Sequence, residues 1–285
     1  MEPQRPSAAE FVENLKIEVY GSGHLWEAGA GAALEEGRVR APRAYVAAAS
    51  VVAFTDGIPQ QQKEDLLNST LLAQLAANKQ HDRERQTLEW YQVYRDVLVK
   101  LGWQPDLRRR PGRFGRDVDS GPALARDPNS IGDRTSFLFD RINVNQSRFT
   151  AAGAVLNRLN GRADQRTFGV TQAAIATLAG LPDRDRRSVI FETSSHSPGR
   201  GNFQIIAVTP VSETVMRMTM VAVYFVTTES VSRVLTFNFG NSSTQMFQSS
   251  DTLTLDSSAY AAVRDKVIAQ LGAQAPAFID EIILA

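Results

Sequence analysis

The chain has 285 residues, with 31 basic and 31 acidic side chains and no cysteine. This length allows one large or two small domains with a substantial buried core. A net charge of zero argues against a dedicated nucleic-acid-binding protein, which normally carries a basic excess to neutralise phosphates. The absence of cysteine excludes disulfides, thiolate metal sites and thiol nucleophiles. With three widely spaced histidines, we expect neither a bound metal nor a cofactor.

The N-terminal residues do not have the layout of a signal peptide, in which basic residues precede an apolar run. The longest nearly apolar stretch, Ala41 to Phe54, is shorter than the roughly 18 residues that span a bilayer. We therefore expect a soluble protein that is cytoplasmic as synthesised. Export to a host would need a route other than Sec.

Residues 1–104 are predicted to be a helical region. Ser7 and Glu10 fit a capping box at a helix start, and apolar side chains recur at helical spacing over 61–79 and 83–101. Tyr45 to Phe54 gives no discriminating period, so it can be a buried helix or a buried strand, and its alanines favour the helix.

Residues 105–134 are rich in Pro, Gly, Arg and Asp and are predicted to form a long loop or linker. Its arginines offer a contact for an anionic lipid surface or a nucleic-acid backbone. The alternative, which we favour, is a solvated loop, because aspartates are interleaved with the arginines. The candidate contact residues are Arg108, Arg109, Arg110, Arg113 and Arg116.

Residues 135–285 are predicted to be an α+β region, and we expect it to form one compact unit with 45–104. A strand at 136–144 precedes helices at about 147–160, 165–180 and 183–194. The period then changes to two, which indicates strands at 202–211, 214–228, 231–239 and 243–255 and helices at 258–271 and 276–283. The predicted fold class is α+β, in which a helical N-terminal half packs with a four-stranded antiparallel β-meander and closing helices.

The strand from Thr214 to Thr228 places an almost continuous apolar row on one face. Methionine side chains are deformable and polarizable, so this row can be ordinary core, which we favour, or the wall of an elongated cavity for an acyl chain. The candidate lipid-binding residues are Met216, Met218, Met220 and Tyr224.

His196 is the one histidine with suggestive neighbours, since serines stand at 194, 195 and 197. A serine hydrolase brings a hydroxyl and an imidazole within hydrogen-bonding distance. The favoured alternative is a polar turn, because turns collect such residues. Among the catalytic sequence motifs, we find no P-loop, no H-E-x-x-H and no G-x-S-x-G.

Four segments carry a resemblance to a known family. They are the Leu66–Leu75 helix, the aromatic helix Glu89–Tyr94 that ends at Gly102–Trp103, the Ser194–Ser197 turn and the Tyr260–Arg264 helix. Over about 60–285 the chain resembles the Erwinia virulence factor (Evf)-like proteins. The resemblance implies a non-catalytic role in contacting a host or a membrane. The founding member of that family is fatty-acylated on a cysteine, so without cysteine any lipid here would have to bind reversibly.

Three functions remain open. The first is a non-enzymatic, effector-like or virulence-factor-like protein that interacts with a membrane, a lipid or a host partner. The second is a structural protein that assembles into a homo-oligomer, because a net charge near zero lowers repulsion between copies. The third is an uncharacterised hydrolase that uses His196.

Overall fold

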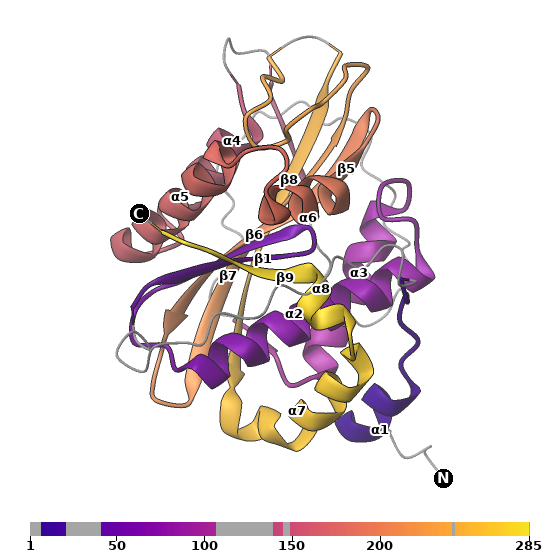
Figure 1. Cartoon of the computed structure of the whole chain (residues 1–285), viewed down its shortest axis with the longest axis vertical. Helices are drawn as coiled ribbons and strands as arrows, with labels where there is room; N and C mark the ends of the chain where they lie inside the picture. The colour runs from indigo at the N-terminus through magenta and orange to yellow at the C-terminus, as the bar shows by residue number, and fades with distance from the viewer. Residues whose placement is uncertain (1–6, 21–40, 107–138, 145–148, 241–242, 285) are drawn as a thin grey trace.

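The centre of the molecule is a mixed β-sheet. The computed structural model describes residues 7–20, 41–106, 139–144, 149–240 and 243–284. In this part of the chain nine strands form one sheet, in the order β3-β8-β7-β6-β2-β1-β9, with β4 added to β8 and β5 to β6 (Figure 1). Strands β2 and β6 run parallel, and all the other pairs are antiparallel.

The strands come from both halves of the chain. Their bounds are β1 Arg43–Ala47, β2 Ser50–Phe54, β3 Gln104–Pro105, β4 Asp140–Ile142, β5 His196–Ser197, β6 Arg200–Pro210, β7 Val215–Val226, β8 Gln245–Asp256 and β9 Ile279–Ile282. The helices are α1 Ala8–Asn14, α2 Gln60–Gln80, α3 Thr87–Lys100, α4 Ala151–Leu159, α5 Gln165–Gly180, α6 Arg186–Ser195, α7 Ser257–Leu271 and α8 Gln274–Phe278.

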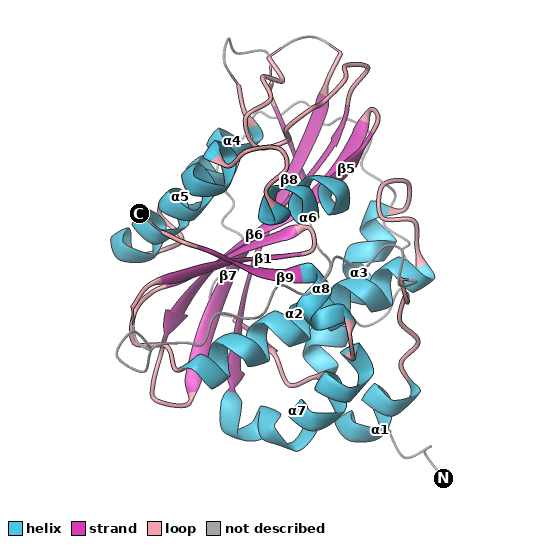
Figure 2. Cartoon of the chain, in the orientation of Figure 1, coloured by secondary structure: helices cyan, strands magenta, loops and turns pink. Residues whose placement is uncertain are grey.

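Helices cover both faces of the sheet. Helices α4, α5 and α6 pack on one face, where α5 and α6 contact β1, β2 and β6 (Figure 2). Helices α2, α3 and α7 lie on the other face, with α1 against α7 and α8 against α2. The central strands are therefore buried on both sides, which is typical of a three-layer α/β architecture.

The predicted fold class is wrong about the number and direction of the strands in the sheet. The structure is mixed α/β with a nine-stranded mixed sheet, where the sequence predicted a four-stranded antiparallel meander. The main cause is the segment Tyr45 to Phe54, which forms the hairpin of β1 and β2 and not a helix. All five residues of β2 are buried, so no alternation of polar and apolar residues marks this strand. A two-residue turn joins the strands, and Ala48 adopts a positive φ of 50° there.

Two further predictions at the C-terminal side are wrong. Residues 231–239 form no strand of the sheet, because side chains and loops bind their backbone: the Val234 N–H donates to Glu192 and the Phe239 N–H to the Phe149 carbonyl. The predicted helix at 276–283 is the short helix α8 followed by the strand β9.

The remaining elements follow the sequence pattern. Strands β6, β7 and β8 pair in the predicted antiparallel order, but they form three strands of the mixed sheet and not a separate four-stranded meander. The capping box of Ser7 and Glu10 is present, although α1 ends at Asn14. Helix α7 begins at the cap Asp256, whose side chain accepts a hydrogen bond from the Ser258 N–H.

Candidate functional site

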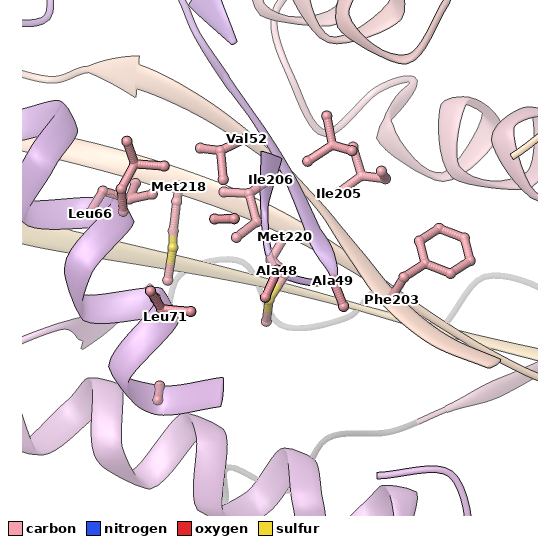
Figure 3. Close-up of a cluster of buried hydrophobic side chains, with 14 of the residues drawn as sticks. Ala48, Ala49, Val52, Leu66, Leu71, Phe203, Ile205, Ile206, Met218 and Met220 are labelled. Carbon is pink, nitrogen blue, oxygen red and sulfur yellow. The ribbon is translucent and has the colours of Figure 1, made fainter. Parts of the chain in front are cut away.

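The methionine row of β7 lies in the core. Met216, Met218 and Met220 have no exposed surface. Figure 3 shows Met218 and Met220 beside Leu66 and Leu71 of α2. A lipid chain on this face would therefore have to separate α2 from the sheet.

Tyr224, the fourth candidate of this row, differs from the methionines. Its side chain is half-buried, and its ring stacks on Phe247 with ring centroids 5.9 Å apart. Burial raises the pKa of its hydroxyl. The five arginines predicted to contact an anionic surface, and most of the loop that holds them, lie outside the described residues.

A tight hairpin fixes the position of His196. Strand β5 pairs with the start of β6, and Pro198 and Gly199 form the turn between them. Gly199 has a φ of +79°, as the third residue of a type II turn requires. The turn is shorter than expected, because Ser194 and Ser195 belong to α6 and His196 and Ser197 to β5, and this arrangement holds the imidazole at the C-terminal end of α6.

The ring nitrogens of His196 do not form a catalytic triad. Nε2 lies 3.1 Å from the carbonyl oxygen of Val231, and a carbonyl only accepts, so Nε2 carries the proton. Nδ1 lies 3.4 Å from Ser195 Oγ and also 3.4 Å from Glu192 Oε2. In a triad the acid and the serine use different ring nitrogens. Here both face the same one, and Ser195 is 1% exposed.

Glu192 and His196 together hold the long connection between β7 and β8 against α6. Glu192 Oε2 accepts a hydrogen bond of 3.1 Å from the Val234 N–H, three residues beyond the carbonyl bound by His196. Burial raises the pKa of the Glu192 carboxyl. The cluster therefore has a structural role, because its hydrogen bonds attach the connection between β7 and β8 to α6.

A second polar cluster joins the two helical layers at the loop between α2 and α3. Arg83 in this loop donates from Nη1 to the Ser194 carbonyl, 2.6 Å away, in the last turn of α6. The C-terminal end of a helix carries partial negative charge, which favours this contact. The guanidinium carbon also lies 5.0 Å from the centre of the Trp90 ring, within the range of a cation–π interaction.

The other edge of the Arg83 guanidinium is buried without a partner. Nε and Nη2 are shielded from solvent, and no described residue accepts a hydrogen bond from either atom. Burial lowers the pKa of Arg83 to about 10, so the group is still charged at neutral pH. An unsatisfied buried donor costs about 1–3 kcal/mol, and more when it is charged. Native structures rarely leave such a group without an ion, a water or a ligand.

A buried network of hydrogen bonds lies beneath this arginine. The Tyr91 hydroxyl donates to Asn202 Oδ1 at 2.6 Å and accepts from Gln204 Nε2 at 2.9 Å. Gln204 Oε1 in turn accepts from the Ser50 hydroxyl at 2.8 Å, and Asn202 Nδ2 donates to the backbone carbonyl of Arg83. The network therefore connects α3, β6 and β2 with the loop that carries Arg83.

Sequence reasoning did not find Arg83. It stands in the run His81-Asp82-Arg83-Glu84-Arg85, which is typical of a solvated turn between helices. Its contact with α6 cannot be read from spacing, because α6 is more than a hundred residues further along the chain. Its position over Trp90 depends on the path of the loop before α3, which the spacing does not give. The signal that was present is the aromatic helix itself, whose Trp90 and Tyr94 rings stack 5.4 Å apart.

In the described part of the chain, no group of three or more His, Cys, Asp or Glu residues is arranged to hold a metal ion. None of the helices described is long and apolar enough to cross a bilayer.

No protein-family model matches the sequence, and no curated protein matches it at a significant level.

Proposed function

We propose that this chain is a non-enzymatic, effector-like protein that acts by binding a partner, either a lipid surface or a host molecule. The observation that carries the proposal is the arrangement around His196. Nε2 is bonded to the Val231 carbonyl, and Ser195, the serine that faces Nδ1, is 1% exposed, so the one hydroxyl that this imidazole faces does not meet a substrate. The resemblance to the Evf-like proteins supports the same role.

Two measurements test this proposal. Flotation of the protein with vesicles of neutral and of anionic lipid measures binding to a lipid surface, and mass spectrometry of the purified protein detects a copurifying lipid. We expect association with at least one vesicle type. No association with either type and no copurifying lipid would remove the lipid branch and leave a host molecule as partner.

The non-enzymatic part of the proposal is tested separately. A screen of ester and amide substrates compares the native chain with His196→Ala. We expect no hydrolysis by either protein. Hydrolysis by the native chain that His196→Ala abolishes would overturn the proposal and establish the hydrolase.

A self-assembling structural protein is the second candidate. It is favoured by the equal numbers of basic and acidic side chains, 31 of each, because repulsion between copies is then low. Light scattering over a range of protein concentrations decides it. A mass that stays at that of one chain at the highest concentration rules this candidate out.

A further inference from the structure

The unpartnered edge of Arg83 has a counterpart elsewhere in the molecule that shows what such an edge binds. Arg264 uses the same two nitrogens to hold the buried carboxylate of Asp65, with Nε–Oδ1 at 2.7 Å and Nη2–Oδ2 at 2.8 Å. These two donors are parallel and lie in the guanidinium plane, so their spacing matches the two oxygens of a carboxylate. Arg83 has the same two donors, Nε and Nη2, but no carboxylate of the described chain is bound to them.

We propose that the Nε/Nη2 edge of Arg83 is a binding site for the carboxylate of a small organic acid. The group is already oriented for binding, because Nη1 is bonded to the Ser194 carbonyl and the guanidinium lies over Trp90. A fixed binding group loses little side-chain entropy when a ligand arrives. The site is independent of the proposed function, because a binding protein, an oligomer or an enzyme can each contain it.

The carboxylates of the described chain do not fill this site. The Glu84 carboxylate accepts a hydrogen bond from the Ser197 hydroxyl, and the Glu18 carboxylate accepts one from the Tyr20 hydroxyl at 2.7 Å. Neither lies within hydrogen-bonding distance of Nε or Nη2. Within the described chain, the end of α6 and the face of Trp90 contact the Arg83 guanidinium directly, and the Glu84 carboxylate acts on its charge without a hydrogen bond to Nε or Nη2.

The surroundings favour a monoanion over a phosphate. The two donors are shielded from water, and the guanidinium lies against the Trp90 ring. A charged ligand that binds to them therefore loses its hydration. A carboxylate leaves the pair neutral, whereas a phosphate dianion leaves a buried net negative charge. The loop that carries Arg83 borders solvent, because its residues Asp82, Arg85 and Gln86 are exposed.

The decisive experiment observes the Nε–H group of Arg83 directly by ¹H–¹⁵N NMR of the full chain. Sodium acetate is the probe, sodium phosphate is the second arm, and sodium chloride at matched ionic strength is the control. We expect acetate to shift the Arg83 Nε–H resonance saturably, with a dissociation constant on the order of millimolar. The Arg264 Nε–H, already bonded to Asp65, is the internal reference and should stay in place.

Each other outcome counts against the proposal. No shift, or the same shift with chloride, would mean that the fork holds only water and would overturn the site. A saturable shift with phosphate and none with acetate would overturn the choice of a carboxylate. A second measurement uses Arg83→Lys, which keeps the charge and removes the fork: acetate should raise the Tm of the native chain and not that of the variant. If this variant fails to fold, the response of the Arg83 Nε–H resonance to acetate in the native chain still tests whether the carboxylate site exists.

Discussion

Two tyrosines of α3, three residues apart, differ in what their buried hydroxyls bind. The Tyr91 hydroxyl is bonded to Asn202 and Gln204, whereas the Tyr94 hydroxyl is buried and has no described partner. Neither side chain has exposed surface. The pair therefore separates the effect of a satisfied buried hydroxyl from that of an unsatisfied one.

We expect Tyr91→Phe to lower the free energy of unfolding by roughly 1–3 kcal/mol, because two buried amide groups lose their partner. Urea denaturation followed by circular dichroism measures this change. Tyr94→Phe is the matched control and should be neutral or slightly stabilising, because it removes a hydroxyl whose desolvation nothing offsets. Equal losses in the two variants would contradict the assignment of the network.

At the residue scale, the sequence indicated which side chains are apolar but not which polar ones are buried. The favoured interpretation of the β7 row as core agrees with the burial of Met216, Met218 and Met220. Arg83 was missed because its partners come from α6 and α3, and a single sequence shows no pattern for a contact between layers.

One buried carboxylate holds helices α2 and α7 together. Asp65 on α2 is 1% exposed and is held by both nitrogens of the Arg264 fork and by the Ser257 hydroxyl. Removing one member of a buried ion pair leaves the other uncompensated, which costs several kcal/mol.

Arg264→Ala should therefore lower the free energy of unfolding by about 3 kcal/mol or more, measured by urea denaturation. Lys266→Ala on the same helix is the control, because Lys266 forms an exposed pair with Glu13. Exposed pairs contribute about 0–1 kcal/mol, so this variant should stay near the native value. A loss below about 1 kcal/mol for Arg264→Ala would contradict the role of this buried pair in holding α7 to α2.

The start of α6 should give stability a dependence on pH. Hydrogen bonds from the Arg187 side chain, 2.7 and 2.8 Å long, lower the pKa of the capping residue Asp185 below its usual 3.8. A lowered folded-state pKa stabilises the fold above the unfolded value, and this contribution is lost as the pH falls through the folded value.

Asp185→Asn keeps the capping oxygen and removes the titration. We expect the native chain to be the more stable protein at about pH 6 and the difference to vanish as the pH falls below 3.8. Thermal unfolding of both proteins at a series of pH values measures this. A difference that stays constant with pH would assign the effect to packing and not to charge.

At the element scale, prediction located the long strands β6 and β7 and elements with one solvent-facing side, and it failed for the two short strands β1 and β2. The buried residues of helix α4 recur at helical spacing, and buried residues of strand β8 are separated by partly buried ones. Both elements were therefore predicted from the period of their apolar residues. Strands β1 and β2 lie between α2 on one side and α5 on the other, so every residue of the two strands except Arg43 is buried. Such a run has no period by which a strand can be told from a helix.

At the scale of the whole molecule, the sheet joins distant segments. The hairpin of β1 and β2 lies between β6 and β9, and the parallel pairing of β2 with β6 joins residues far apart in the chain, such as Val52 and Ile206. The sequence predicted that residues 45–104 and 135–285 pack together, but it could not predict this strand order, because strand order depends on contacts far apart in the chain.

The free edge of β9 is covered by the protein's own side chains. The Glu281 N–H donates to Asp280 Oδ1 at 2.9 Å, and the Glu281 carbonyl accepts from Arg187 Nη1 at 3.3 Å. Unpaired N–H and C=O groups at a sheet edge invite pairing with a second chain, and charged side chains are one natural protection. Ile283 beside this edge is 74% exposed, so the edge also offers apolar surface.

The double variant Asp280→Ala/Arg187→Ala uncovers both backbone groups, and we expect it to dimerise by strand addition at β9. Analytical ultracentrifugation over a range of concentrations should show a larger dimer fraction than for the native chain. Glu281→Ala is the control, because it removes a charge from the same strand, breaks the pair with Arg43 and leaves the backbone covered. If both variants associate equally, loss of charge and not exposure of the edge drives association. If neither associates more than the native chain, a feature of this edge other than Asp280 and Arg187 prevents pairing.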